Sequence, residues 1–132
     1  MKLKIATDIL VFKDKKILLV KRRHKPFKNK WSLPGGFLEV GNEDLKNAAK
    51  RELKEETNLK IDPTNLELLN IYSSPHRDPR GHVISVAYIA TKWKGKAKAN
   101  SDAKELRFFS LPNLPSLAFD HLEIIKDYKN EA

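Results

Sequence analysis

Three glutamates, Glu52, Glu55 and Glu56, are the residues in this chain best suited to chemistry. In an α-helix, residues three and four apart are neighbours, so these carboxylates would repel one another unless a cation binds them. Mg²⁺ prefers octahedral oxygen ligands, namely a few carboxylates and the phosphates of a substrate. We therefore predict a site for Mg²⁺, with Mn²⁺ as the alternative ion. Zinc is disfavoured, because the chain has no cysteine and no paired histidine spacing.

The helix that carries these glutamates is predicted to be amphipathic. At about 100° per residue, Glu52 and Glu56 fall on the arc of its apolar residues, which are Leu45, Ala48 and Ala49. The opposite, wet face carries three lysines: Lys46, Lys50 and Lys54. An ordinary solvated helix explains the lysines, but it does not explain carboxylates on an apolar stripe. Unpaired buried carboxylates cost several kcal/mol, so we expect Glu52 and Glu56 to bind a metal ion.

This segment resembles the Nudix box, the pattern G-x5-E-x7-R-E-U-x-E-E-x-G-U, where U is aliphatic. The resemblance covers residues 36–59, and the second half of the pattern is in register at Arg51, Glu52, Leu53, Glu55, Glu56 and Leu59. Asn58 stands where the pattern has its last glycine. That change is mild, because asparagine also tolerates the left-handed conformation at a helix C-terminus. So long a pattern arises by chance far less often than a lone glycine motif.

The first half of the box differs in spacing. Six residues separate Gly36 from Glu43 where the pattern has five, whereas the seven residues between Glu43 and Arg51 match it. Either one residue is inserted around positions 40–42, or Glu39 takes the role of Glu43. The sequence leaves both alternatives open.

The resemblance implies a role for each box residue. Glu52 and Glu56 would be the main metal ligands, with Glu55 as a further ligand or as a base that acts through a water. A backbone carbonyl near Gly35 would complete the coordination of the metal. Arg51 would pair with an acid and orient the loop.

The reaction that the resemblance implies is hydrolysis of a diphosphate linked to a nucleoside. The bound metal would neutralise charge on the phosphates and lower the pKa of the attacking water. The family often adds one more carboxylate, either to the metal site or as the base. Glu105 and Asp102 are the candidates. We favour Glu105 with its side chain turned inward, and the alternative is an ordinary surface acid.

Hydrophobic periodicity predicts the elements around the box. Strands are expected at residues 5–12 and 16–21, joined as a β-hairpin by a polar turn. Further strands are expected at 66–72, 83–91 and 106–110, and a closing helix at 117–128. Strands on both sides of one central helix, together with the resemblance, predict the α/β class: a Nudix-type α/β/α sandwich with a mixed central sheet.

Length and charge fit one enzyme domain over residues 1–132, of which 40% are hydrophobic. The net charge of +9 favours anionic partners, and a small-molecule nucleotide is the expected substrate. A solvated, lysine-rich surface explains the excess charge better than nucleic-acid binding does. The N-terminal segment resembles neither a signal peptide nor a membrane span, so we expect a cytoplasmic protein without a membrane partner. A homodimer is left open.

Residues outside the box decide the substrate. The polar loop at 73–82 and the segment at 117–121 resemble the ADP-ribose pyrophosphatase branch of the family. Arg80 could contact phosphate or ribose, and Phe119 could line the pocket for the base. Alternatively, Arg80 closes its turn by pairing with Asp78, and Phe119 belongs to the core.

A basic loop at 22–30 precedes the glycine turn in sequence. Arg23 is the candidate in this loop for a phosphate contact, and the alternative is ordinary surface charge.

The resulting hypothesis is Mg²⁺-dependent hydrolysis of ADP-ribose, or of a related nucleoside diphosphate linked to another moiety, which for ADP-ribose gives AMP and ribose 5-phosphate. One alternative is a pyrophosphohydrolase for oxidised nucleoside triphosphates, which would share the metal site. The other is a non-catalytic sensor of ADP-ribose or a nucleotide sugar, which the shifted box would suit. Against the sensor, Arg51 and all three glutamates of the box are present.

Overall fold

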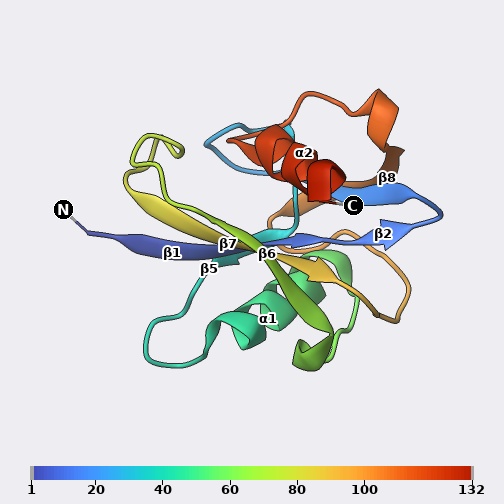
Figure 1. The fold of residues 1–132 in the computed structure, drawn as a ribbon, viewed down its shortest axis with the longest axis horizontal. Helices are drawn as coiled ribbons and strands as arrows, with labels where there is room; N and C mark the ends of the chain where they lie inside the picture. Colours follow the sequence, from blue (N-terminus) through green and yellow to red (C-terminus); the bar gives the residue numbers. More distant parts are fainter. Residues whose placement is uncertain (1, 132) are drawn as a thin grey trace.

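Two four-stranded sheets lie between two helices (Figure 1). This computed structural model describes residues 2–131. In the first sheet, β1 (Lys4–Leu10) is central and pairs in parallel with β7 (Val83–Ala90). The antiparallel strands β5 (Gly35–Phe37) and β6 (Leu66–Tyr72) complete the order β5-β1-β7-β6. The sheet is therefore mixed, as predicted.

The second sheet is antiparallel and is built around β3 (Lys16–Arg22). β3 pairs with β2 (Phe12–Lys13), β4 (Trp31–Ser32) and β8 (Ala103–Ser110). The pairing with β8 brings a segment from near the end of the chain beside the N-terminal strands.

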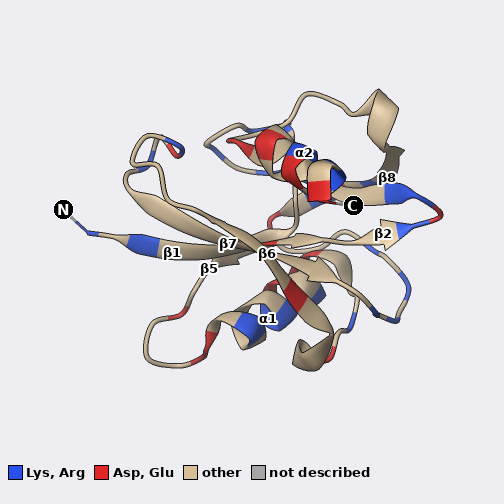
Figure 2. Ribbon diagram, viewed as in Figure 1, with Lys and Arg blue, Asp and Glu red and all other residues tan. Residues whose placement is uncertain are grey.

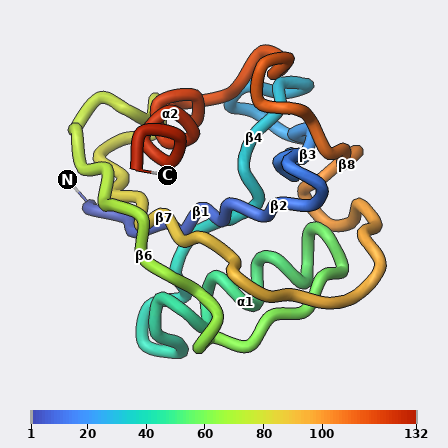
Figure 3. The backbone as a smooth tube through the Cα atoms, turned by 45° about the vertical axis from the view of Figure 1, so that its right-hand side comes forward, coloured from blue at the N-terminus to red at the C-terminus, as the bar shows by residue number. Residues whose placement is uncertain are grey.

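Helices α1 (Leu45–Thr57) and α2 (His121–Glu131) cover opposite sides of the strands in both views (Figures 1 and 3). Because successive side chains of a strand point to opposite faces, β1 contributes to both cores. Ile9 belongs to the core that contains Leu53 of α1, whereas Leu10 belongs to the core that contains Ile124 of α2. This arrangement is the α/β/α sandwich that the sequence predicts. Within residues 2–131, no helix is both long and apolar enough to cross a membrane.

Two short 3₁₀ helices lie in the connections, η1 (Pro63–Asn65) before β6 and η2 (Leu111–Asn113) after β8. The closing helix begins at His121 instead of at residue 117. The preceding segment is held differently, because Leu117 forms a β-bridge with Trp31 and Phe119 has a φ of 51°. A left-handed residue cannot continue a right-handed helix, so α2 starts beyond it.

The predicted hairpin between residues 5–12 and 16–21 is wrong in its first strand. That run is divided between β1 of the first sheet and β2 of the second, and only β2 pairs with β3, through Phe12 and Ile17. Val11 lies at the crossing, where its carbonyl oxygen accepts from the backbone N–H of Leu18 at 2.8 Å. Periodicity reveals an extended apolar run, but it does not reveal that the run changes partner midway.

Helix α1 carries both signs of charge (Figure 2), and its three lysines are exposed while Ala48, Ala49, Leu53 and Glu56 are buried. It begins at Asp44, whose side chain accepts from the backbone N–H of Asn47 at 2.9 Å. It ends at Asn58, which has a φ of 64° and donates its own backbone N–H to the carbonyl oxygen of Lys54. Asparagine thus supplies the left-handed stop expected at this position.

Two substitutions of Asn58 distinguish the energetic cost of its left-handed backbone from the cost of losing its side chain. We expect Asn58→Ala to lower the free energy of unfolding by about 1–2 kcal/mol, because a Cβ disfavours left-handed backbone and the side-chain bond to the carbonyl oxygen of Lys96 is lost. Asn58→Gly also loses that bond but relieves the backbone, so it should be clearly more stable than Asn58→Ala in urea denaturation. Equal stability of the two variants would contradict this account.

Candidate active site

The inner face of α1 meets β5 at a glycine pair. The backbone N–H of Gly35 donates to Oε1 of Glu56 at 2.9 Å. A Cβ on Gly36 would lie 2.5 Å from the carboxyl carbon of Glu52, and a Cβ on Gly35 would lie 1.9 Å from the carbonyl oxygen of Thr7. Only glycine permits so close an approach. The glycine turn therefore sets the distance between the strand and the two carboxylates.

Arg51 ties the loop before α1 to the helix. Its Nε and Nη2 each donate to Glu43 at 2.8 Å, its Nη1 donates to Glu52 at 2.8 Å, and its Nη2 also donates to the carbonyl oxygen of Phe37 at 3.1 Å. The hydrogen bonds from Arg51 lower the pKa of Glu43 to about 2. Glu39 is the weaker partner, with Oε1 at 3.4 Å from Nε of Arg51. The geometry therefore favours Glu43, and not Glu39, in the first acidic position of the box.

Glu52 and Glu56 are unusual carboxylates, because burial raises the pKa of Glu52 to about 7 and that of Glu56 to about 8. The negative charge of Asp102 contributes in the same direction at both sites. Arg51 opposes the shift at Glu52, and the N–H of Gly35 opposes it at Glu56, but burial prevails. The protein leaves these two charges under-compensated, which is the environment that a bound cation would stabilise.

A divalent ion fits this pair chemically. Two largely buried carboxylates with raised pKa offer hard oxygen donors, and the surroundings of each favour the addition of positive charge. Within residues 2–131, no three Asp, Glu, His or Cys side chains are gathered closely enough to form a cage as they stand. The remaining ligands would therefore come from backbone oxygens, water or the phosphates of a substrate, as is usual for Mg²⁺.

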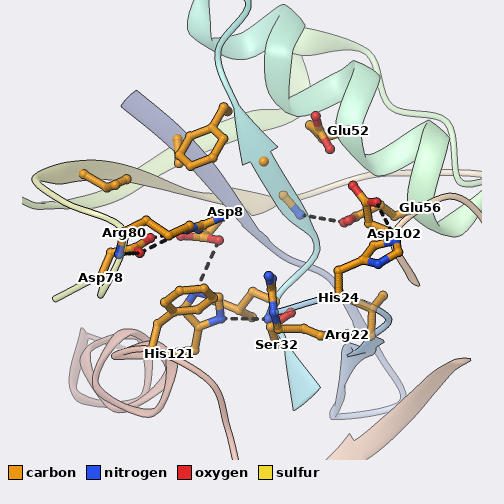
Figure 4. Close-up of a pocket in the computed structure, with 18 of the residues that line it drawn as sticks. Asp8, Arg22, His24, Ser32, Glu52, Glu56, Asp78, Arg80, Asp102 and His121 are labelled. Carbon is orange, nitrogen blue, oxygen red and sulfur yellow. Dashed lines mark hydrogen bonds and ion pairs between the residues drawn. The ribbon is translucent and has the colours of Figure 1, made fainter. Parts of the chain in front are cut away.

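Glu52 and Glu56 open into a cavity of about 330 Å³. Figure 4 shows them on one side of the cavity, with Asp78, Arg80 and His121 on the other. The walls come from β1, β3, β4, β5 and α1, from the loop after β3 and from the segments before β7 and α2. The cavity thus joins the acidic helix to a basic and aromatic half built from distant parts of the chain.

Most of the residues predicted for the site line this cavity. They are Gly35, Arg51, Glu52, Glu56, Arg80 and Phe119. Arg80 pairs with Asp78, which was one of the two alternatives predicted for this arginine. It also lines the cavity. Pairing within the turn and placement in the pocket therefore do not exclude each other.

Three of the predicted residues lie elsewhere. Glu55 has 46% of its side chain exposed and contacts Arg51 at 3.3 Å. Glu105 lies opposite Lys21 in the β3–β8 pairing and forms an ion pair with it at 3.4 Å. Arg23 is exposed and donates its Nε to the carbonyl oxygen of Ser101.

Residues nearby in sequence line the cavity in place of Arg23 and Glu105. Arg22 lines the cavity where Arg23 does not, and Asp102 lines it where Glu105 does not. Arg22 is the last residue of β3 and lies on the cavity wall, whereas Arg23 lies beyond the strand, where its backbone N–H donates to the carbonyl oxygen of Asp102 at 3.1 Å. Asp102 was the second candidate from the sequence, and it precedes β8, outside the ladder that holds Glu105.

Phe119 lies on the cavity wall beside two arginines. The guanidinium carbon of Arg22 lies 4.9 Å from the centre of its ring, and that of Arg80 lies 5.3 Å from the same centre. Arg80 also stacks over Phe37 at 4.7 Å. Phe27, from the loop after β3, meets Phe119 edge to face at 4.8 Å. Phe119 therefore lines the pocket, and it is not part of either hydrophobic core.

A polar network beside the cavity, formed by His121, Asp8 and Ser85, was not predicted from the sequence. Nδ1 of His121 accepts from the backbone N–H of Leu33 at 3.0 Å, so its proton lies on Nε2, which faces Asp8 at 3.4 Å. Ser85 donates to the other oxygen of Asp8. Burial lowers the pKa of His121. The available signal was an acid, Asp8, within the apolar run of β1.

Fold and site together define a class of protein: an α/β domain with metal-compatible carboxylates on one helix, beside a basic and aromatic pocket of ligand size. The family model of the NUDIX domain matches residues 2–128. The chain therefore belongs to the Nudix family, whose members generally use divalent metal ions.

Individual relatives agree with this membership. Over 124 residues the chain is 56% identical to an ADP-ribose pyrophosphatase from Methanocaldococcus jannaschii, which covers 94% of this chain and 72% of that protein. A bifunctional NMN adenylyltransferase/ADP ribose pyrophosphatase from Francisella tularensis, solved with AMP and a manganese ion, is 31% identical with a TM-score of 0.86. That similarity covers 98% of this chain but only 42% of the Francisella chain.

A third relative was solved with a bound nucleotide sugar. The NUDIX domain of Shewanella oneidensis NrtR, solved with ADP ribose, is 29% identical with a TM-score of 0.83. It covers 98% of this chain and 86% of that domain's chain.

The two acids near Arg51 can be distinguished by mutation. Glu43→Gln should lower the free energy of unfolding by about 1–3 kcal/mol, because it removes a bidentate, charged partner from Arg51. Glu39→Gln is the matched control and should change stability by less than about 0.5 kcal/mol. Urea denaturation of both variants measures the difference. A larger loss in Glu39→Gln would assign the role to Glu39.

The buried glutamates predict a pH dependence of stability. Their pKa values of about 7 and about 8 lie above the 4.5 of an ordinary glutamate. Without metal, the folded protein therefore binds more protons than the unfolded chain between about pH 4.5 and pH 8, so the free energy of unfolding falls as pH rises across this range and levels off above it. We expect the Tm of metal-free protein to fall by roughly 5–10 °C between about pH 6 and pH 9. Mg²⁺ should offset the fall, because it binds the charged carboxylates.

Two variants test the source of that trend. Glu56→Gln should reduce the fall in Tm, because its amide does not titrate. Glu67→Gln, at an exposed position on β6, should keep the wild-type trend. A metal-free Tm that rises steadily toward pH 9 would show that these carboxylates do not govern stability.

Proposed function

We propose that this protein hydrolyses ADP-ribose to AMP and ribose 5-phosphate, with Mg²⁺ as its ion and Mn²⁺ as a substitute. The observation that carries the proposal is the shared cavity, in which Glu52 and Glu56 face Arg22, Arg80 and Phe119. One half offers donors for a metal ion, and the other offers cations and an aromatic ring for a nucleotide. The 56% identical relative is named an ADP-ribose pyrophosphatase, which supports this choice of substrate.

The acidic half would position the chemistry. Glu52 and Glu56 would hold the ion, with a backbone oxygen near Gly35 beside them. A bound divalent ion supplies charge neutralisation at the diphosphate and lowers the pKa of a bound water. Arg51 holds one oxygen of Glu52 at 2.8 Å and leaves the other without a hydrogen bond among residues 2–131. Glu55 lies beside the cavity wall through its contact with Arg51 at 3.3 Å, and it would take the proton of the attacking water as a base.

The basic half would bind the rest of the substrate. Arg22 and Arg80 would meet the diphosphate, because both line the cavity and both guanidinium groups lie near the ring of Phe119. Phe119 would contact the adenine base through its ring. Asp102 would supply the extra carboxylate, because it lines the cavity and acts on the pKa of both Glu52 and Glu56. Glu105 is paired with Lys21 instead.

A sensor without catalysis is the second candidate, because the similar NrtR domain was solved with ADP ribose. The contacts within the box argue for catalysis. Glu43, Arg51 and Glu52 form a continuous series of hydrogen bonds at 2.8 Å despite the longer spacing after Gly36. The extra residue has therefore not broken the clamp at Arg51.

Removal of one carboxylate tests the reaction. Glu56→Gln should lower kcat for Mg²⁺-dependent release of AMP from ADP-ribose by roughly a thousandfold or more, because it removes a metal donor while keeping nearly the same shape. Lys50→Gln, on the exposed face of α1, should keep the wild-type rate. The assay is AMP release by chromatography with and without Mg²⁺.

Other outcomes of that assay decide between the candidates. Wild-type turnover in Glu56→Gln would contradict the role of Glu56. Turnover of oxidised nucleoside triphosphates in preference to ADP-ribose would favour a nucleotide-sanitising enzyme. Binding of ADP-ribose by the wild-type protein without any turnover would favour the sensor.

A further inference from the structure

The arginines of the cavity are mostly neutralised by carboxylates. Arg51 is paired with Glu43 and Glu52, and Arg77 forms a bidentate pair with Asp120 at 2.6 and 2.8 Å. Arg80 is paired with Asp78 through Nη2 at 2.8 Å and Nε at 3.1 Å. Few of the arginines on the cavity wall therefore have charge to spare for a phosphate, and the wall also carries Lys25.

Arg22 is the exception. Its Nε donates to the carbonyl oxygen of Pro26 at 2.7 Å, which leaves its charge unopposed at close range. Within residues 2–131, no carboxylate oxygen lies within 4.0 Å of its nitrogens. Arg22 and Arg80 thus both lie close to the ring of Phe119, at 4.9 and 5.3 Å from its centre, one with a free charge and one with a paired charge.

Asp78 is a buried ion-pair partner of Arg80. Its side chain is only 2% exposed, whereas 37% of the Arg80 side chain is exposed. Asp78 also accepts the backbone N–H of Arg80 at 2.9 Å. Burial opposes ionisation of Asp78, but the hydrogen bonds from Arg80 prevail and lower its pKa, so it remains charged. Of the five N–H donors of Arg80, two bind Asp78, and the rest can still reach a phosphate.

Diphosphate diesters and nucleoside triphosphates differ in the negative charge of their phosphates. A diphosphate joined at both ends carries one negative charge on each phosphate. A triphosphate has one more phosphate, and its terminal group carries up to two charges at neutral pH. Beside Arg22 and Lys25, an Arg80 that is half neutralised by Asp78 offers less positive charge to a third phosphate than an unpaired Arg80 would, so the pairing disfavours the more highly charged triphosphate.

We propose that Asp78, by neutralising Arg80, makes the cavity select diphosphate diesters over nucleoside triphosphates. Asp78 is a positioning residue that acts through Arg80. The proposal rests on the proposed function for the kind of substrate, and it assigns the basis of selectivity to one buried carboxylate.

The test compares kcat/KM for ATP and for ADP-ribose in Mg²⁺. Asp78→Asn should raise the ratio of ATP to ADP-ribose by about tenfold or more, because it frees the charge of Arg80. Arg80 should stay in place, since Phe37 and Phe119 still contact its guanidinium. Asp62→Asn is the matched control, because it removes one negative charge at an exposed helix cap where asparagine serves equally well. It should leave the ratio unchanged.

A double variant shows whether Asp78 acts through Arg80. In the Arg80→Gln background, Asp78→Asn should no longer change the ratio. A merely structural role of Asp78 would lower kcat/KM for both substrates alike and leave the ratio unchanged, which would overturn the proposal. A change in the ratio that persists without Arg80 would also overturn it, because Asp78 would then repel the substrate directly.

Failure of this proposal can be told apart from failure of the proposed function. If the wild-type protein hydrolyses neither compound, the proposed function is wrong. The same variants are then compared by the dissociation constants of ATP and ADP-ribose in Mg²⁺, measured by calorimetry. A ratio of affinities that is equal in wild type and Asp78→Asn would overturn the selectivity proposal on its own.

Discussion

The burial of two carboxylates against a glycine turn is the constraint on which the rest of the structure depends. Glu52 and Glu56 lie on the face of α1 that also packs into the core, so the helix cannot rotate them into water without exposing Leu53. Isolated buried charges are costly. Hydrogen bonds from Arg51 and Gly35 offset part of that cost, and the raised pKa values show that part remains.

Arg51 explains how the longer box keeps its geometry. The loop between β5 and α1 absorbs the extra length at its outer edge, where Val40 is 85% exposed and Gly41 has a φ of 86°. Glu43 returns to Arg51, and its carboxylate also accepts the backbone N–H of Glu39 at 3.0 Å. An added residue in a solvent-exposed turn changes no buried contact, so the clamp is maintained although the spacing differs.

The sequence was informative where a local pattern determines the structure. The 3.6-residue period placed Glu52 and Glu56 on the buried face of α1, and Asn58 marked its end. The sequence was less informative where a shift of one residue decides whether a side chain lines the cavity or lies at the surface. Arg22 and Arg23 are chemically alike, but β3 ends between them, with Arg22 on the cavity wall and Arg23 at the surface. Glu105 forms an ion pair instead, because the pairing of β8 with β3 places it opposite Lys21.

The basic half of the cavity is the part that no local pattern could assemble. Arg22 ends β3, where the connection to β4 begins, and Arg80 and Phe119 lie in the connections before β7 and α2, so residues far apart in sequence share one cavity wall. The acidic half, by contrast, comes from one helix and the strand that precedes it. Chemistry encoded in one continuous segment can stay constant while the three connections vary. The charge pairing within those connections, more than the box, is therefore where this fold can adjust which phosphate compound it accepts.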